Sequence, residues 1–454
     1  MKKLMALLLS VLMVFSLVAC GNTEKNSAKE ADVNEKDNGE VAEAAIVTSL
    51  TEPVEIEFWH AMSGVNAEAI EKITNDFMAA NPNIKVSLVH QGGYRDLFDK
   101  LMGAAKADQL PTIAQIYSNR LSWYVSKGLV ENLNPYMADA NIGLTEEDMT
   151  DIPTMFLNDG IWNGNQYAMP LNKSQMVLYY NVGMFEEAGL EVPTTWEEWK
   201  EVSAKLTVDA DNDGEPEVYG TVFANGLSTD IAPYLKQAGG TTMSEETNEL
   251  FFDTPETKET VEFLNDMIQS KAARLAGDDG HPNIPIQQGR AAMCVASTSA
   301  LPYIEGGTAE GISISAAPLP SYKSDDQLFY GTNVTVFNTH SKEEKYAAWE
   351  YIKFLTNTEN TAYFGSQTGY IPVRKSAKND PVFKAVLEAK PIKKVPFACM
   401  DRGFQGTRNI GGINALDCLG EELDQVFAGT KSIDDALRDA QERGTQAMKE
   451  ARSN

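Results

Sequence analysis

The chain has 454 residues, of which 43% are hydrophobic, and a formal net charge of −27 at pH 7. One hydrophobic core rarely extends over that length, so we expect a globular protein of two lobes or domains. The acidic excess excludes a nucleic-acid partner, since phosphate backbones are bound by surpluses of Lys and Arg. It also argues against a protein that lies flat on an anionic membrane surface.

The N-terminus has the features of an export signal. Lys2 and Lys3 precede an apolar stretch at 4–14, and the sequence Leu-Val-Ala-Cys-Gly at 17–21 resembles the lipobox of bacterial lipoproteins. We therefore predict a lipoprotein signal peptide at 1–20 with Cys20 as the acylated residue; a plain secretory peptide is the alternative. No later run reaches the roughly 18 apolar residues of a spanning helix, so the lipid would be the only attachment to the membrane. We therefore expect an exported protein that a lipid anchors to the outer face of the cell membrane.

Residues 21–52 are rich in Glu, Lys, Asn, Asp and Ala, which predicts a flexible acidic tether. The remaining cysteines, Cys294, Cys399 and Cys418, are too few and too scattered for a disulfide framework. Buried thiols are the favoured interpretation, and pairing of Cys399 with Cys418 stays open.

The folded part begins with a strand, helix and strand at 54–60, 67–81 and 84–89, followed by a helix at 95–107 and a strand at 112–117 ending at Ser118-Asn119. This order predicts a parallel sheet covered by helices, with an α/β fold. Ligands gather at the carboxyl ends of such strands, here at Met62-Ser63 and at 91–94.

The stretch 167–181 combines a polar patch, Asn172 to Gln175, with the β-favouring run 176–180. We expect a loop, a short polar crossing and then a strand, with the crossing running between two lobes and lining a cleft. An ordinary surface loop is the alternative.

Further along, Thr195 is expected to cap a helix. The sequence from Asp209 to Gly214 matches the first half of a calcium loop, but Gly220 stands at the twelfth position, where the bidentate Glu belongs. We favour a solvated acidic turn over a metal site. Later strands are expected at 219–223, 290–296 and 329–337, and helices at 230–239, 254–271, 342–355, 359–367, 381–389, 414–428 and 432–452.

No sequence motif of catalysis, of a cofactor or of a metal centre stands out, so we expect no enzyme activity and no cofactor. The segment 390–408 is locally basic, with Lys390, Lys393, Lys394, Arg402 and Arg408 against Asp401 alone. An anionic ligand needs such donors in an acidic protein, and Arg suits bidentate binding of phosphate or carboxylate. A surface run that balances nearby acidic groups is the alternative.

Several short stretches, in their order and spacing, resemble the solute-binding proteins of bacterial ABC importers, in particular the carbohydrate-uptake type and its glycerol-3-phosphate-binding branch. They are Phe58-Trp59-His60-Ala61-Met62, Gly93-Tyr94, Gln115-Ile116-Tyr117, 170–181, Gly369-Tyr370-Ile371-Pro372 and Glu421-Glu422-Leu423. The resemblance implies a two-lobed type II periplasmic-binding-protein fold, like that of maltose-binding protein, with three crossings near 171–174, Pro318 and 354–358. It places 53–172 and 318–356 in the N-terminal lobe, and 173–317 and 357–454 in the C-terminal lobe.

The resemblance also implies ligand contacts from Tyr94, Ser174, Ser297 or Thr298, Gly331, Tyr370 and Arg408. Two positions depart from the pattern: Ser118 replaces the family's glutamate that holds glycerol hydroxyls, and the stretch around 225–228 lacks the family's tryptophans. We therefore expect a monomeric protein that captures a polyol phosphate (glycerol 3-phosphate or a glycerophosphodiester) or a sugar and delivers it to a membrane permease. A neutral oligosaccharide receptor is the first alternative, and an exported glycan-active enzyme the second.

Overall fold

The computed structural model describes residues 46–228 and 230–453. The predicted signal peptide, Cys20 and most of the predicted tether lie outside the described residues. Ile46 and Leu50, expected in the tether, instead pack against a hydrophobic core. Cys294, Cys399 and Cys418 are free thiols. In the two described ranges no helix is both long enough and apolar enough to cross a membrane.

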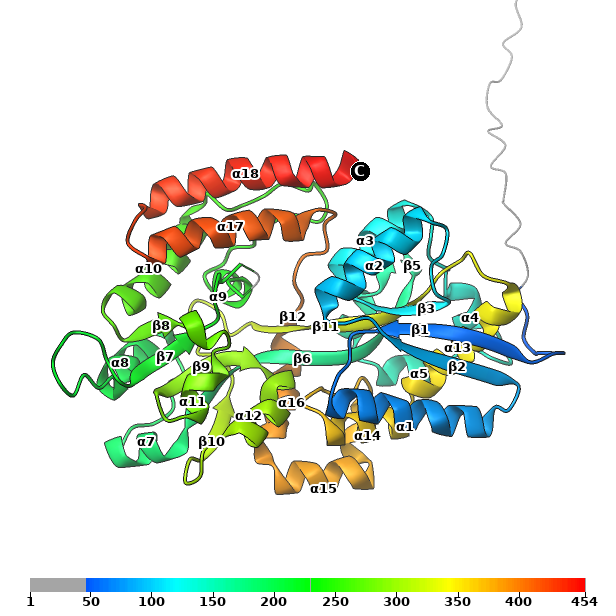
Figure 1. The fold of residues 1–454 in the computed structure, drawn as a ribbon, viewed down its shortest axis with the longest axis horizontal. Helices are drawn as coiled ribbons and strands as arrows, with labels where there is room; N and C mark the ends of the chain where they lie inside the picture. Colours follow the sequence, from blue (N-terminus) through cyan, green and yellow to red (C-terminus); the bar gives the residue numbers. More distant parts are fainter. Residues whose placement is uncertain (1–45, 229, 454) are drawn as a thin grey trace, which may run out of the picture. The chain divides into compact units, whose positions relative to one another are not determined.

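One ten-stranded sheet organises the described chain (Figure 1). Its strands are β1 (Val54–His60), β2 (Ile84–His90), β3 (Ile113–Ile116), β6 (Ala168–Asn181), β7 (Tyr219–Phe223), β8 (Ala273–Leu275), β9 (Ala291–Ser297), β10 (Ile314–Ala317), β11 (Gln327–Val336) and β12 (Gly403–Phe404); β4 (Ile161–Trp162) and β5 (Asn165–Gln166) form a separate hairpin. The order is β2-β1-β3-β11-β6-β9-β7-β8, with β10 paired to β6 and β12 paired to β11. The parallel pairing of β1 with β2 and β3 confirms the predicted strand-helix-strand opening. The sheet as a whole is mixed and not parallel as expected, because the pairs of β11 with β3 and of β6 with β11 and β9 are antiparallel.

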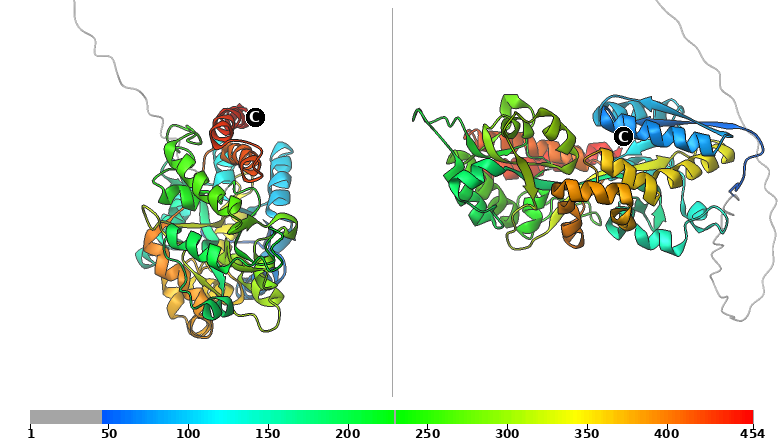
Figure 2. Two further views of the ribbon diagram at one scale, coloured as in Figure 1. Left: turned by 90° about the vertical axis from the view of Figure 1, so that its left-hand side faces the viewer. Right: turned by 90° about the horizontal axis from the view of Figure 1, so that it is seen from below.

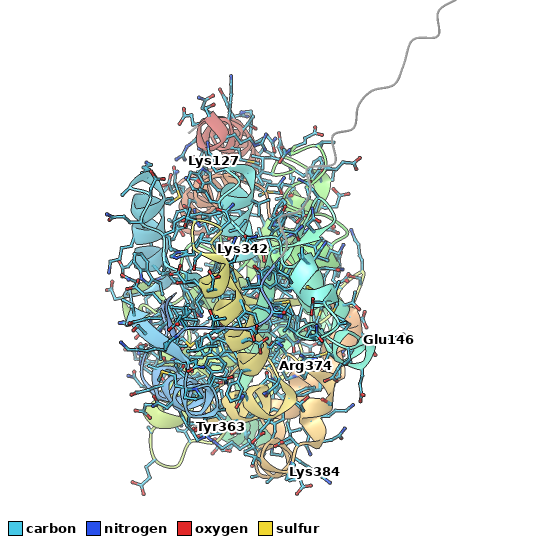
Figure 3. The ribbon with its side chains drawn as sticks, turned by 90° about the vertical axis from the view of Figure 1, so that its right-hand side faces the viewer. Lys127, Glu146, Lys342, Tyr363, Arg374 and Lys384 are labelled. Atoms are coloured by element: carbon cyan, nitrogen blue, oxygen red, sulfur yellow. The ribbon has the colours of Figure 1, made fainter. Side chains whose placement is uncertain are left out.

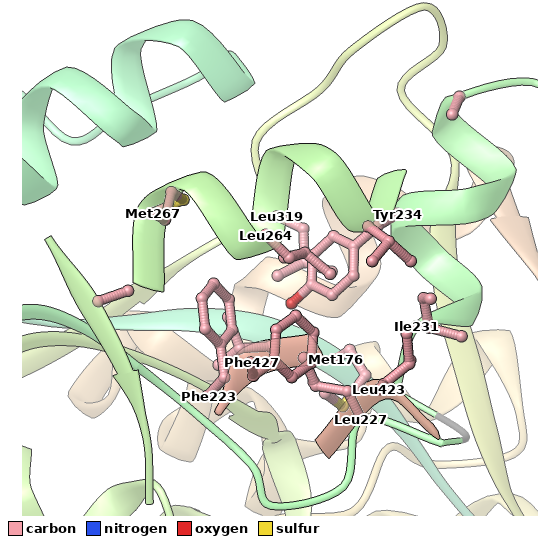
Figure 4. Packing of buried hydrophobic residues seen from close by; sticks show 14 of the residues in the cluster. Met176, Phe223, Leu227, Ile231, Tyr234, Leu264, Met267, Leu319, Leu423 and Phe427 are labelled. Atoms are coloured by element: carbon pink, nitrogen blue, oxygen red, sulfur yellow. The ribbon is translucent and has the colours of Figure 1, made fainter. Parts of the chain in front are cut away.

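Two groups of helices cover this sheet, and their hydrophobic cores define two lobes. The first lobe has a core containing Phe58, Phe77 and Trp349, and the second has a core around Trp199, Phe223 and Leu423 (Figure 4). Helices of the first lobe are α1 (Val65–Ala80), α2 (Tyr94–Lys106), α3 (Ser118–Ser126), α4 (Asn134–Ala138), α5 (Glu146–Asp151), α6 (Thr154–Asn158), α13 (Lys342–Leu355), α14 (Thr358–Gln367), α15 (Pro381–Ala389) and α16 (Val395–Cys399). Those of the second are α7 (Val182–Ala188), α8 (Trp196–Leu206), α9 (Ala232–Gln237), α10 (Pro255–Gln269), α11 (Asn283–Gln287), α12 (Leu301–Gly307), α17 (Gly412–Phe427) and α18 (Ile433–Ser453).

The predicted helix start at Thr195 is confirmed. The Thr195 side chain accepts a hydrogen bond from the amide of Glu198 at 3.2 Å, and a second bond joins the Glu198 carboxylate and the Thr195 amide at 3.2 Å. In this second bond the Thr195 amide is the donor and the Glu198 carboxylate the acceptor, so the reciprocal cap satisfies two amides that have no acceptor within the helix. The capped helix α8 then places Trp196 and Trp199 in the second lobe's core.

Strands β6 and β11 run through both lobes and form the first two crossings (Figure 1). The second crossing lies in β11 and not near Pro318 as expected, because Leu319 still belongs to the second lobe's core. The two strands pair antiparallel, with Ser174 opposite Tyr330 and Asn172 opposite Thr332. The loop expected before Met176 is absent from the described chain, because β6 is continuous from Ala168 to Asn181. Its polar patch is buried. The backbone there forms a strand and not a loop, because the polar side chains have hydrogen-bond partners inside the protein.

The third passage between lobes lies later in the chain than we expected. Phe364 and Val373 belong to the first lobe's core, although 357–454 was assigned to the other lobe. Arg374 (Figure 3) is buried there, donating from Nε to the Thr356 carbonyl at 2.7 Å and from Nη1 to the Asp148 carbonyl at 2.6 Å. The segment around α16 contacts both lobes, because Ile392 and Val395 pack against buried residues of the second lobe and Cys399 belongs to the first lobe's core. The chain then passes through β12, which pairs with β11, to α17 (Figure 1). Figure 2 shows α17 and α18, in orange and red, beside the green helices of the second lobe.

A buried ion pair fixes the crossing strands to the first lobe. The Lys173 side chain is fully buried, and its Nζ lies 2.5 Å from Asp159 Oδ2 and 2.8 Å from Asn333 Oδ1. Asn333 Nδ2 donates to Asp159 Oδ2 and to Ser118 Oγ, both at 3.0 Å. These contacts join β6, β11, the segment after α6 and the start of α3, so each charge and amide has a partner away from water.

Replacing Lys173 by Met is expected to lower the free energy of unfolding by about 3–5 kcal/mol, because Asp159 keeps a buried charge without a counter-ion. Urea denaturation measures the change. Lys72→Met is the control: Lys72 pairs with Asp76 at 2.6 Å with 54% of its side chain exposed, so its loss costs below about 1 kcal/mol. Equal effects of the two substitutions would contradict the structural role of Lys173.

The stability of the fold should also depend on His60. Burial, and secondarily His90, lowers the pKa of His60 from 6.5 to about 4, and its Nδ1 accepts a hydrogen bond from the Met62 amide. Below pH 6.5 the unfolded chain binds a proton that the folded protein takes up only near pH 4, so stability falls across this window as pH falls.

We expect wild type to lose about 3 kcal/mol more free energy of unfolding between pH 7 and pH 4 than His60→Gln does. Urea titrations at each pH give the difference, and substitution of the exposed His281 by Gln should keep the wild-type slope. Parallel pH profiles for wild type and His60→Gln would refute the assignment.

Candidate ligand-binding cleft

Three tyrosines meet where the first lobe faces the second. Tyr94 begins α2, and its Oη lies 3.2 Å from Tyr370 Oη, while its ring packs edge-on against that of Tyr117 at 5.0 Å. Burial is the main cause that raises the pKa of all three phenols. They therefore stay protonated at neutral pH and offer hydroxyl groups without charge.

The crossing strands orient this cluster through side-chain amides. Asn172 Nδ2 donates to Tyr94 Oη at 3.1 Å, and Gln115 Nε2 donates to Asn172 Oδ1 at 3.0 Å. Thr332 on β11 donates to the same Asn172 oxygen. The orientation of Asn172 is thus fixed by β3 and β11, which pre-organises the Tyr94 hydroxyl.

Two cavities lie between the lobes on either side of Tyr117. The first, of about 230 Å³, we call the Arg120 cavity; its walls include Tyr94, Arg95, Phe98, Gln115, Tyr117 and Arg120 of the first lobe, and Ile413 and Asp417 of α17. The second, of about 270 Å³, we call the Thr407 cavity; its walls include Tyr117, Asn119, Asp230, Thr242, Tyr330, Thr407 and Ile413. Because they share Tyr117 and Ile413, the two cavities adjoin.

The structure places some predicted contact residues around these cavities. Tyr94 and Tyr370 are brought together as described above. Ser174 Oγ donates to the carbonyl of Tyr330 at 3.3 Å, and Tyr330 itself lines the Thr407 cavity. Ser297 accepts a hydrogen bond from the Ser299 amide at 3.1 Å, so it caps the short helical turn after β9.

Two further predicted residues have structural partners in this conformation. Ser118 is buried and accepts the hydrogen bond from Asn333, whereas its neighbour Asn119 lines the Thr407 cavity. Gly331 has a φ of 140°, and a Cβ there would lie 2.1 Å from the carbonyl oxygen of Asn172. The position therefore requires glycine because the backbone of β6 approaches it closely.

Arg408 is engaged at the junction of the lobes and lines neither cavity. Its Nε and Nη2 donate to the Glu245 carboxylate at 3.0 and 2.8 Å, and its Nη1 donates to the carbonyls of Asn158 and Ile161 at 2.6 and 2.9 Å. The guanidinium also lies 4.9 Å from the centre of the Trp162 ring. Glu245 belongs to the second lobe and the other partners to the first, so Arg408 joins the two.

Most of the other basic residues of 390–408 also have partners. Lys390 pairs with Glu305 at 2.7 Å, and Arg402 pairs with Asp325 at 2.8 Å. Lys393 donates to the carbonyls of Gly365 and Thr368. Most of the positive charge of this segment is therefore balanced or hydrogen-bonded within the protein.

The acidic loop after α8 brings carboxylate oxygens of Asp209, Asp211 and Asp213 within 4.8 Å of one another. Asp209 accepts from the Gly214 amide at 3.0 Å and Asp211 from the Asp213 amide at 3.1 Å. These are bonds of a polar turn, and the favoured interpretation of a solvated acidic turn stays a prediction.

Sequence reasoning missed Tyr117, Asn119, Arg120, Thr242 and Thr407 as cleft residues. The end of the third strand was the available signal for the first three, because ligand sites lie at the carboxyl ends of parallel strands. Thr242 lies in a segment without a motif, and only the tertiary fold brings it to the Thr407 cavity.

This fold and its interlobe cleft define a binding protein, and the chain belongs to the family of bacterial extracellular solute-binding proteins, whose model matches residues 72–391. Among curated relatives, the sn-glycerol-3-phosphate-binding periplasmic protein UgpB of Rhizobium meliloti is 26% identical over 416 residues, covering 88% of this chain and 95% of the relative. UgpB of Escherichia coli is 24% identical over 412 residues, covering 87% and 92%.

Solved structures share the fold. UgpB from Mycobacterium tuberculosis in complex with glycerophosphocholine has a TM-score of 0.77 at 24% identity, covering 87% of this chain and 99% of that one. An ABC substrate-binding protein from Listeria monocytogenes in complex with cycloalternan has a TM-score of 0.76 at 20% identity, covering 88% and 100%. The likeness confirms the predicted two-lobed α/β architecture.

Substitution of Gly331 by Ala is expected to destabilise the protein by about 3 kcal/mol, because the new methyl group would meet the β6 backbone in an unfavourable φ region. Thermal or urea unfolding measures the loss. Gly103→Ala on α2 is the matched control, since nothing lies within 4 Å of its Cβ position; it should be neutral or slightly stabilising. A neutral Gly331→Ala variant would contradict this account of the crossing.

Proposed function

We propose that this protein is the substrate-capturing component of an ABC importer, binding a small polyol phosphate or a sugar between its lobes and delivering it to the permease subunits. The observation that carries the proposal is the pair of adjoining cavities that share Tyr117 and Ile413, one residue from each lobe. A ligand there touches both lobes at once, so it stabilises the closed conformation, which is the form that a permease can recognise.

The groups around the cavities support a hydroxyl-rich ligand. Neutral phenols at Tyr94 and Tyr117, the Asn119 amide and the hydroxyls of Thr242 and Thr407 offer donors and acceptors, while the rings offer apolar faces. The names of the relatives favour a glycerol phosphate ester, and the cycloalternan complex keeps a neutral oligosaccharide as the second candidate.

We infer a binding protein and not an enzyme, because the family is one of solute-binding proteins and Tyr94, Asn172 and Gln115 bond to each other in a fixed network. An exported glycan-active enzyme ranks below both binding hypotheses, and turnover of a glycan panel would establish it. We further propose export under the signal at 1–20 and anchoring of a monomer through a lipid on Cys20.

Arg408 remains our proposed phosphate contact, together with Ser174, Ser297, Gly331 and the tyrosines. In the present conformation its guanidinium binds Glu245, so the proposal requires the anion to replace that carboxylate. When the ligand's anionic group replaces the Glu245 carboxylate, the Arg408 guanidinium keeps a negative partner. This replacement therefore costs less free energy than a step that leaves the guanidinium unpaired.

Binding is tested with purified wild type by calorimetry and thermal unfolding in the presence of glycerol 3-phosphate, glycerophosphocholine and maltose. We expect at least one to raise Tm by mass action. Arg408→Gln should weaken binding of the phosphate esters about 30–100-fold, through the lost charge-assisted hydrogen bonds, and leave maltose unaffected.

Arg402→Gln is the control, because Arg402 pairs with Asp325 and does not line either cavity. Absence of binding to all three ligands would exclude this ligand class. Unchanged affinity of Arg408→Gln for an ester that wild type binds would remove Arg408 from the site.

A further inference from the structure

Arg120 is a half-buried cation in the wall of the cleft. Its guanidinium carbon lies 3.9 Å from the centre of the Phe98 ring, and the side chain faces the Arg120 cavity. Within residues 46–228 and 230–453 its guanidinium makes no hydrogen bond and no ion pair at contact distance. An arginine that is partly desolvated yet keeps its donors unused is poised to bind an acceptor.

The charges around it leave the cavity suited to a negative group. Asp417 of α17 faces Arg120 across the cleft and Asp99 lies behind it on α2, while Arg95 contributes a second guanidinium to the same wall. Asp417 and Asp99 act on the Arg120 guanidinium only through space, without direct contact. A ligand anion therefore competes with no carboxylate for its hydrogen bonds.

The start of α3 adds further polar groups at the same place. Arg120 lies in the first turn of this nine-residue helix, which Tyr117 precedes without a side-chain cap. The Arg120 amide donates to the Tyr117 carbonyl at 2.9 Å, so the first-turn amides that have no acceptor within the helix are those of Ser118 and Asn119, and such amides favour anions. The neighbouring Asn119 Oδ1 is buried without a hydrogen-bond partner beside the Thr407 cavity, so it can accept from a ligand hydroxyl.

We propose that Arg120, supported by the first turn of α3, binds the anionic group of the ligand, and that hydroxyl groups of the same ligand occupy the Thr407 cavity. The ligand class is a polyol that carries one phosphodiester or carboxylate and is long enough to fill both cavities. A glycerophosphodiester and an acidic disaccharide share this chemistry. The inference rests on the proposed function, and it adds Arg120 to Arg408 as a contact of the ligand's anionic group.

The geometry distinguishes the two arginines. Arg408 already donates to Glu245 and to two main-chain carbonyls, so a ligand must first displace a partner there. Arg120 is available without such a rearrangement, and its stacking on Phe98 holds the guanidinium plane in the cavity wall. Arg120 therefore makes the first anion contact, before any exchange at Glu245.

The test measures affinities of wild type, Arg120→Gln and Arg120→Lys for glycerophosphoglycerol, for lactobionate, a disaccharide acid with one carboxylate, and for maltose, by calorimetry at low and high salt. We expect Arg120→Gln to weaken binding of one or both anionic ligands 10–100-fold, with a shallower salt dependence than wild type, and to leave maltose affinity unchanged. Arg120→Lys keeps the charge but loses the planar contact with Phe98, so it should lose less affinity than Arg120→Gln. Arg438→Gln, at an exposed position of α18, is the matched control and should equal wild type.

The outcomes separate this inference from the proposed function. Wild type that binds maltose alone would overturn the inference and leave solute capture intact, whereas wild type that binds none of the ligands would overturn both. Anionic binding that survives in Arg120→Gln would also overturn the inference. The Tm of each variant without ligand verifies that it folds. If Arg120→Gln does not fold, the affinity of Arg120→Lys for the anionic ligands decides the question. An undiminished affinity of Arg120→Lys would exclude a contact that depends on the guanidinium group and would overturn the inference.

Discussion

The contact between Lys173 and Asp159 is the constraint on which the arrangement of the two lobes depends. It buries a positive charge in the middle of β6, the strand that both lobes share. Burial of an ion pair adds little net stability to the fold. It does favour one register of the paired strands over all others, because any shift in register would leave a buried charge without its partner. The polar groups that surround the cleft are therefore held at fixed positions by an ion pair that lines neither cavity.

Local sequence patterns predicted much of the fold. The strands at 54–60 and 219–223 and the helices at 342–355 and 381–389 were found with their observed bounds, since alternation and caps are local signals. The stretch 167–175 was predicted as a loop followed by a polar crossing and not as part of the strand, because the hydrogen-bond partners of its side chains, such as Gln115 and Asn333, lie far away in sequence. The same limit affected 357–399, whose apolar residues do not reveal which of two cores they join.

The binding site, like the fold, has features that the sequence predicts and others that depend on tertiary contacts. Tyr94 and Tyr370 were predicted from a family resemblance and do meet in space, but no pattern of charge could tell which arginine has unused donors. The basic run 390–408 drew attention to Arg408, and its neighbours in the fold show that most of that charge is already balanced. Arg120, isolated in sequence among uncharged residues, is distinguished only by what it does not bond to within the described residues.

The antiparallel pairing of β6 with β11, whose register shifts between Thr332 and Asn333, has a mechanical consequence. Lobes joined by irregular loops can swing by changing a few backbone angles, but here a change in angle must be spread as twist along two hydrogen-bonded strands. The buried side chains of Asn172 to Gln175 have hydrogen-bond partners on neighbouring elements. These bonds resist twisting of the two strands and so limit the rotation of one lobe relative to the other. Each lobe then returns to the same orientation after every cycle of capture and release, without any part of the connection having to unfold.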